Sequence, residues 1–340
     1  MKSRRIVLIA LLAMLLTPLA NAQLVTGLEG SFGSTVGPDG ALYVTERVAG
    51  RVSRVDPWTG DVTPLADGLP IPAVDIGANG AVDVAFVDGV AYALVTVVGP
   101  GLDFLAPIIG APPGFAGDDA AGIYRIDGPA TATLVADLGQ WSVDHPPLNP
   151  AFIAHGVQYA MEPFRGGLLV SDGHHNRILW VSPDGEITEF ATFDNIVPTG
   201  LEVFGKTVFL SQAGPVPHLP ENGKVVAIDA KSGMVAEVAN GAPLAVDVEF
   251  GPGRTMYVLA QGIWTGLFGD DGSPADPWTG SLHKVESDGS LSEVASGLNM
   301  PTSMEFIGNT AYIVTLTGEI WTVDEPSGPP FGPPPRKHKH

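Results

Sequence analysis

The clearest fold signal is Gly37-Pro38-Asp39-Gly40-Ala41-Leu42-Tyr43-Val44. It joins a Gly/Pro/Asp turn to a short apolar run, which is typical of a β-hairpin. It recurs as Gly251-Pro252-Gly253-Arg254-Thr255-Met256-Tyr257-Val258, and more loosely as Ile307-Gly308-Asn309-Thr310-Ala311-Tyr312-Ile313-Val314. A hairpin unit that returns along one chain predicts a repeat architecture.

Two further units recur with it. The pattern Gly-x-β-x-β-Asp, or a close variant of it, starts at Gly50, Gly122, Gly223, Gly280 and Gly318. A third unit ends most repeats: Thr63-Pro64-Leu65-Ala66-Asp67-Gly68-Leu69 resembles Ser292-Glu293-Val294-Ala295-Ser296-Gly297-Leu298. Each repeat therefore has four strands, as a propeller blade does. We count six repeats, which start near Phe32, Ala73, Ile153, Val197, Pro243 and Asn299.

The last repeat stops at Asp324, before its outer strand. The missing strand stands at the other end, because residues 23–28 (QLVTGL) match residues 293–298 (EVASGL). A strand borrowed from the N-terminus would leave no open edge at the seam. The sequence thus predicts an all-β, six-bladed propeller over residues 23–325, with four-stranded blades and the last blade closed by the N-terminal strand.

The two ends differ from this body. Residues 1–22 have a basic start, an apolar run from Ile6 to Leu16 and a small-residue cleavage site at Ala20-Asn21-Ala22, which predicts a cleaved signal peptide. The alternative, a membrane anchor, needs about 20 apolar residues. Residues 326–340 form a Pro-rich basic tail that we expect to be disordered. We therefore expect a secreted or periplasmic protein, and the absence of cysteine means that it folds without disulfides.

The net charge of −20 excludes nucleic acid as a partner, because such a surface repels phosphate. No other segment is long and apolar enough to cross a membrane. We expect a monomer whose partner is a small molecule, a glycan or an envelope protein.

Four long loops lie between predicted strands, at residues 99–121, 139–151, 212–222 and 262–279. In a propeller, loops of this kind share one face with the crossings between blades. Long loops are often functional, and the apolar content here suggests a lid or a groove; alternatively, the loops pack on each other and close the channel.

Within the first loop, we expect five apolar side chains to be exposed: Leu102, Phe104, Leu105, Ile108 and Ile109. The predicted ligand contacts are Phe104, Gln158, Gln212 and Trp264.

Five histidines map to the same face: His145, His155, His174, His175 and His218. Neutral imidazole is both a metal ligand and an acid-base group near pH 7. The sequence gives His155, His174 and His175 as catalytic candidates, and His155, Asp172, His174 and His218 as candidate ligands for Ca²⁺, Mg²⁺ or Zn²⁺, with His155 nearest the channel. No short ligand spacing supports a metal site, so separate loop histidines remain the alternative.

Two acidic positions recur in register. Asp83 and Asp247 align in the second and fifth repeats, which face each other across a six-bladed ring. Glu202, Glu249 and Glu305 form a second column, which Gln158 fills in the third repeat. These carboxyls indicate either an acidic channel that attracts a cation or buried groups bonded to the backbone of the next blade. The recurrence favours the structural role.

One segment resembles an NHL repeat, a propeller motif marked by Asn-x-Arg-Ile and a following acidic turn: Asp172-Gly173-His174-His175-Asn176-Arg177-Ile178-Leu179-Trp180-Val181-Ser182-Pro183-Asp184-Gly185. Most of the chain also resembles the exported propeller family of the scytonemin cluster (ScyD/ScyE-type), through residues 37–46, 137–139, 172–184 and 246–252. The resemblance implies the fold and export, and it implies no reaction.

Two functions remain open. The first is a binding or accessory propeller that recognises a small molecule, glycan or protein on its loops. The second is a metal-assisted hydrolase or lyase that uses the loop histidines. Six-bladed lactonases hold calcium through Glu, Asn and Asp, whereas the matching places here fall near Phe32, His155 and Thr199. Streptogramin lyases use a histidine with Mg²⁺, a part that His155 or His174 would take.

Overall fold

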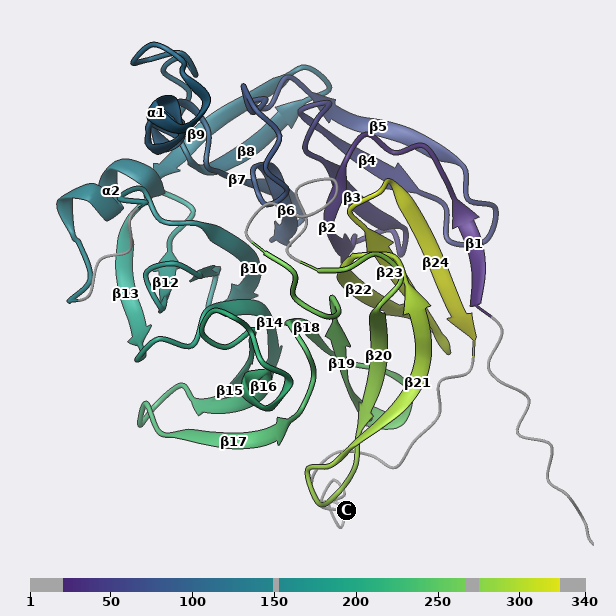
Figure 1. The fold of residues 1–340 in the computed structure, drawn as a ribbon. Coiled ribbons are helices and arrows are strands. Elements are labelled where there is room, and N and C mark those ends of the chain that lie inside the picture. The colour runs from purple at the N-terminus through teal and green to yellow at the C-terminus, as the bar shows by residue number, and fades with distance from the viewer. Residues whose placement is uncertain (1–20, 149–152, 267–274, 325–340) are drawn as a thin grey trace, which may run out of the picture.

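The protein is a six-bladed β-propeller (Figure 1). The computed structural model describes residues 21–148, 153–266 and 275–324. Within these ranges, six four-stranded antiparallel sheets stand around a central channel. The predicted fold class and blade number are confirmed. No helix of the described residues has the length and apolarity needed to cross a membrane.

The first three blades follow the chain in order, each running from its innermost to its outermost strand. Blade 1 consists of β2 (Ser31–Val36), β3 (Leu42–Glu46), β4 (Arg51–Val55) and β5 (Val62–Asp67). Blade 2 consists of β6 (Gly80–Val87), β7 (Val90–Thr96), β8 (Gly122–Gly128) and β9 (Thr131–Asp137). Blade 3 consists of β10 (Gln158–Phe164), β11 (Gly167–Asp172), β12 (Arg177–Val181) and β13 (Ile187–Thr192).

The other three blades repeat this pattern until the seam. Blade 4 consists of β14 (Pro198–Phe204), β15 (Thr207–Gln212), β16 (Lys224–Asp229) and β17 (Val235–Asn240). Blade 5 consists of β18 (Ala245–Phe250), β19 (Met256–Ala260), β20 (Gly280–Val285) and β21 (Leu291–Leu298). Blade 6 consists of β22 (Pro301–Ile307), β23 (Thr310–Thr315), β24 (Glu319–Asp324) and β1 (Asn21–Val25).

The predicted closing strand is present. Strand β1 pairs antiparallel with β24, and Gln23 and Val25 lie opposite Trp321 and Ile320. Beyond β1, Leu28 N–H donates to the carbonyl of Gly318 at 3.1 Å. Val25 and Leu28 also pack into an apolar cluster that joins blade 6 to blade 1. The strand starts at Asn21, so it includes the last two residues of the predicted signal peptide.

The recurring turn has a packing reason. Asp39 accepts from the Ala41 N–H and the Tyr43 hydroxyl, which ties the turn to the second strand. A Cβ on Gly37 would overlap the Tyr43 ring, and a Cβ on Gly251 would overlap Tyr257 in blade 5. Glycine in the turn and tyrosine in the strand therefore recur together because the ring covers the turn.

Burial falls from the channel outward. The strand β6 at the channel and the second strand β11 are almost wholly buried, whereas the outer strands β13 and β17 are largely exposed. Most apolar clusters lie between neighbouring blades, such as the one that joins Tyr43 to Val84 and Ala93. Adjacent blades thus stabilise one another, as expected of a repeat array.

One face of the ring carries the long loops. It is formed by the second-to-third-strand loops and by the crossings between blades, and we name it the loop face. It holds the short helices η1 (Gly99–Leu105), α1 (Ala106–Ile109), α2 (Leu138–Asp144) and η2 (Pro220–Asn222), while η3 (Pro252–Arg254) lies at the opposite face. Ile108 and Ile109 are exposed as expected, but η1 turns Leu102 and Leu105 inward, so those two residues are buried.

Candidate functional site

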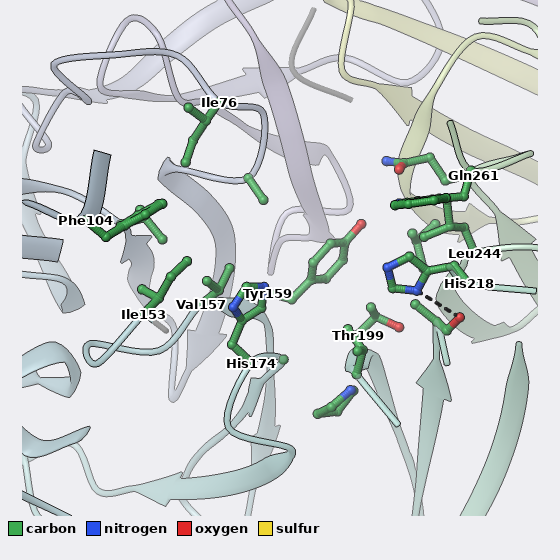
Figure 2. A pocket seen from close by; sticks show the side chains of 18 residues that line it. Ile76, Phe104, Ile153, Val157, Tyr159, His174, Thr199, His218, Leu244 and Gln261 are labelled. Atoms are coloured by element: carbon green, nitrogen blue, oxygen red, sulfur yellow. Dashed lines mark hydrogen bonds between the residues drawn. The ribbon is translucent and has the colours of Figure 1, made fainter. Parts of the chain in front are cut away.

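An apolar cavity opens on the loop face at the mouth of the channel (Figure 2). Its volume is about 180 Å³. Among the described residues it is lined by loops, crossings and strand ends of blades 2 to 5: Ile76, Ala78, Val97, Phe104, Ile153, Val157, Tyr159, Gly173, His174, Val197, Pro198, Thr199, Ala213, His218, Leu244, Val246, Gln261 and Trp264. We name it the loop-face cavity.

Tyr159 forms the floor of this cavity. Its ring lies edge-on to Phe32, with ring centroids 5.2 Å apart, and its hydroxyl donates to the carbonyl of Thr302 at 3.2 Å. These contacts hold a blade 3 side chain against blades 1 and 6. Tyr159 also lines the space below. It is therefore the lining residue that the apolar cavity and the space below have in common.

Below Tyr159 the channel is narrow and acidic. This second space has a volume of about 30 Å³, and its described lining includes Asp83, Asp247, Glu162, Glu249 and Glu305 and no Lys or Arg. We name it the acidic channel.

The two aspartates of the acidic channel are inter-blade links. Asp83 accepts from the N–H of Val84, beside it on β6, at 2.8 Å, and from the N–H of Met161 in blade 3 at 2.7 Å. Asp247 does the same with Val248 at 2.9 Å and with Met304 in blade 6 at 2.8 Å. The structural role that the sequence favoured is confirmed.

Each link also contacts the preceding blade. A Cβ on Gly33 in blade 1 would overlap the Asp83 carboxyl, and a Cβ on Gly200 in blade 4 would overlap the Asp247 carboxyl. Each aspartate thus spans three blades. The ring accordingly contains two copies of one linkage, in blades 1 to 3 and in blades 4 to 6.

The glutamate column needs one correction. Glu202 lies opposite Phe209, Glu249 opposite Tyr257 and Glu305 opposite Tyr312, and Glu162 holds the same register in blade 3, opposite Leu169. Gln158 lies opposite Asp172 at the start of β10. The prediction that Gln158 fills the column in blade 3 is therefore wrong by four residues, because Glu162 occupies that position. The irregular register between Gln158 and Met161 makes this offset hard to read from sequence.

Burial weakens ionisation throughout the acidic channel. It raises the pKa of Asp247 to about 7 despite the two backbone hydrogen bonds, and it also raises to about 7 the pKa of Glu202, which is outside the described lining. Burial, together with the neighbouring carboxyls, raises the pKa of Glu162, Glu249 and Glu305 well above the usual value. These groups carry less negative charge at neutral pH than their number implies.

Two of the predicted histidines face the loop-face cavity. His174 and His218 both line it, the first from the β11–β12 loop and the second from the β15–β16 loop. Burial lowers the pKa of both imidazoles. They are therefore neutral at pH 7, and each is able to take a proton or to form a neutral hydrogen bond.

The other predicted histidines lie outside the cavity lining. His155 lies against Gly101 and Gly139 and does not line the cavity, so its predicted place nearest the channel stays a prediction. His175 is buried and contacts the carbonyl of Ile153 through Nε2 at 3.1 Å. His145 is exposed and stacks on Trp141.

Asp172 belongs to a buried polar cluster of blade 3. It accepts from Arg177 Nε at 3.1 Å, and Arg177 also donates to Ser142 Oγ at 2.9 Å and to the His145 carbonyl at 2.8 Å. Burial would raise the pKa of Asp172, but His175 and Arg177 hold it below the usual value. This cluster fixes α2 and the loop that carries His174.

The predicted metal ligands do not form one group. No set of three or more His, Asp or Glu side chains within the described ranges is placed to hold a metal ion. Asp172 accepts a hydrogen bond from Arg177, whereas His174 and His218 face the cavity. The cation thus stays a prediction.

Of the predicted ligand contacts, Phe104 and Trp264 line the cavity. Gln158 is buried elsewhere, where it binds Thr96 and the His155 carbonyl, and Gln212 is buried outside the lining. Sequence reasoning missed Tyr159 and Gln261, which do line the cavity. Gln261 had a usable signal, since it is a polar residue directly after the buried strand β19 at the loop face.

The fold resembles several solved enzymes. The virginiamycin B lyase of Staphylococcus aureus matches with a TM-score of 0.52 and 15% identity, over 90% of this chain and 98% of that chain. A gluconolactonase of Xanthomonas campestris matches with a TM-score of 0.58 and 15% identity, over 90% and 89%. The aldose sugar dehydrogenase of Streptomyces coelicolor matches with a TM-score of 0.56 and 15% identity, over 90% and 99%.

At this identity the likeness shows the fold alone. No family model and no curated protein matches the sequence.

Proposed function

We propose that this protein is a small-molecule-binding propeller and that the loop-face cavity is its binding site. The observation that carries the proposal is one preformed apolar space to which four blades contribute lining residues. Binding sites for small molecules are typically concave, mostly apolar and equipped with a few convergent polar groups. A glycan would need more polar partners than this lining provides.

Filling the cavity tests the proposal. Ala78 lies at its wall and is half-buried, so Ala78→Phe would occupy the space with limited disturbance of the core. We expect this variant to weaken binding of a small ring probe, 4-fluorotoluene, at least tenfold in a ¹⁹F NMR titration. Ala111→Phe, a half-buried position outside the lining, is the matched control. Equal binding by wild type and Ala78→Phe would place the probe elsewhere and contradict the proposal.

The second candidate function is a hydrolase or lyase. It is supported by the two neutral imidazoles in one cavity, because a histidine with a pKa near or below neutrality is a suitable general base. If it is correct, an aryl lactone or ester turns over, and His174→Phe abolishes turnover while the melting curve stays the same. Absence of turnover across a panel of such substrates favours the binding function.

Export forms part of the same proposal. The basic and apolar pattern of residues 1–22 supports a cleaved signal peptide and a secreted or periplasmic location. Cleavage would remove Asn21 and Ala22 from β1 and leave Gln23 and Val25 paired with β24. N-terminal sequencing of the exported protein should begin at Gln23.

A further inference from the structure

Three polar side chains of the loop-face cavity, His218, Gln261 and Trp264, lie where blades 4 and 5 meet. His218 and Trp264 lie in contact there, with ring centroids 6.0 Å apart. Gln261 stands three residues before Trp264 in the same loop, and its N–H is fixed to the Leu244 carbonyl at 2.9 Å. Figure 2 shows the Gln261 and His218 side chains on one side of the cavity, across from Phe104 and Ile153.

The side chain of Gln261 has no protein partner in the described part of the chain. It is only 4% exposed, and no hydrogen bond of its amide is present there. The amide is not fully buried, so water in the open cavity reaches it. Because the amide lines an open cavity, a bound molecule can supply the missing bond.

Trp264 presents a second unsatisfied group. Its Nε1 is buried and has no hydrogen-bond partner among the described residues. Indole Nε1–H is a donor only. A ligand that satisfies it must bring an acceptor.

His218 presents the opposite chemistry. Its Nδ1 contacts the carbonyl of Ala213 at 3.3 Å, and a carbonyl only accepts, so Nδ1 carries the proton. Burial lowers the pKa of His218, which keeps the ring neutral. Its Nε2 is therefore a bare acceptor, and a ligand that uses it must bring a donor.

The surroundings limit the charge of that ligand. The lining that the described residues form holds no carboxylate, Lys or Arg, so an ion would be buried against it without a counter-charge. The net charge of −20 further disfavours an anion. The volume of about 180 Å³ suits a molecule built on a single ring, since a cavity of about 150 Å³ accommodates benzene.

We propose that the loop-face cavity takes an uncharged ring compound that carries a carboxamide or lactam group. This inference rests on the proposed binding function and narrows its ligand class. The ligand N–H donates to His218 Nε2, and the ligand carbonyl accepts from the Gln261 amide and Trp264 Nε1–H. The apolar wall around Phe104 and Ile153 covers the ring.

Four probes of one shape separate the parts of this inference: 4-fluorobenzamide, 4-fluoroacetophenone, 4-fluorotoluene and 4-fluorobenzoate. In ¹⁹F NMR titrations at pH 7.5 we expect 4-fluorobenzamide to bind about three- to tenfold more tightly than 4-fluoroacetophenone. The ketone should in turn bind more tightly than 4-fluorotoluene by a similar factor. Each factor corresponds to about one net hydrogen bond between the probe and the cavity. The benzoate should bind most weakly.

Gln261→Met keeps the length of the side chain and removes its hydrogen bonds. It should lower the affinity for amide and ketone about three- to tenfold and leave that for toluene unchanged. Gln212→Met, a buried glutamine outside the lining, should change none of the four affinities. If Gln261→Met fails to fold, His218→Phe replaces it: without the Nε2 acceptor, the preference for amide over ketone should fall about three- to tenfold.

The outcomes distinguish this inference from the proposed function. If toluene binds as tightly as the amide, the polar corner is unused and the ligand class is wrong, while the cavity remains a binding site. If none of the four probes binds, the proposed function fails and the inference with it. A preference for the benzoate would overturn the argument from charge.

Discussion

The loop-face cavity and the acidic channel share one lining residue, Tyr159, yet their chemistry is opposite. Above Tyr159 the walls are apolar and come mostly from loops that differ between blades. Below it the walls come from equivalent positions of the inner strands, and carboxyls recur there. Recurring positions thus hold the ring together, whereas variable loops form the cavity that we propose as the binding site.

The two regions also differ in how they use polar groups. In the acidic channel, Asp83 and Asp247 each accept from one backbone N–H of their own strand and from one of the following blade. In the cavity, Trp264 Nε1 is buried without such a partner among the described residues, and the Gln261 amide faces the open space. A satisfied buried group indicates a structural role, and an unsatisfied one at a cavity wall indicates a ligand.

The largest expected effect comes from breaking an inter-blade link. Asp247→Ala leaves the N–H groups of Val248 and Met304 buried without an acceptor, which should lower the free energy of unfolding by about 2–6 kcal/mol. Asp83→Ala should cost a similar amount, because the two links are equivalent. Urea denaturation measures both.

The exposed turn residue Asp184 supplies the control, since Asp184→Ala should cost well under 1 kcal/mol. If the links are independent, the losses in the double variant should add. A loss below about 1 kcal/mol for either single variant would mean that the aspartates are not the links described above.

The contrast between the regions also explains what the sequence could predict. The Gly37 turn, the Tyr43 strand and the match of residues 23–28 to an outer strand follow from local patterns that repeat, so blade number and ring closure were accessible. The inter-blade role of Asp83 and Asp247 was accessible for the same reason. A residue that recurs at one position of the blade has similar neighbours in each blade, so its role can be predicted from the repeat.

The residues of the cavity could be predicted from the sequence only in part, because the loops converge through packing that no repeat encodes. Phe104, Trp264, His174 and His218 were found by residue type and by their loops. Leu102 looked exposed but is buried, because η1 folds it inward. Tyr159 was missed because its role depends on Phe32 and Thr302, which lie far away in the chain.

A smaller effect should appear in the pH dependence of stability. Burial raises the pKa of Glu202 to about 7, so the folded state binds more protons than the unfolded state. The stabilisation is complete below about pH 4.5 and is lost as the pH rises through 7. We therefore expect Glu202→Gln to raise the melting temperature at pH 8 by about 2–6 °C and to change it little at pH 5.

Glu186→Gln, at an exposed glutamate of a turn, is the control for this comparison. Differential scanning calorimetry at both pH values measures the change. The assignment of a raised pKa to Glu202 fails if its replacement lowers stability at pH 8 as much as at pH 5.

The smallest expected effect has the opposite sign and belongs to the cavity. Burial lowers the pKa of His218, so the folded state resists protonation while the unfolded chain takes up a proton near pH 6.5. Its contribution is present above that pH and is lost as the pH falls. His218→Asn, which suits the positive φ of 53° at this position, should reduce the decline in melting temperature between pH 7.5 and 5 by no more than about 3 °C. The exposed His145, replaced in the same way, should leave that decline unchanged, and an equal change in both variants would show that cavity burial is not its cause.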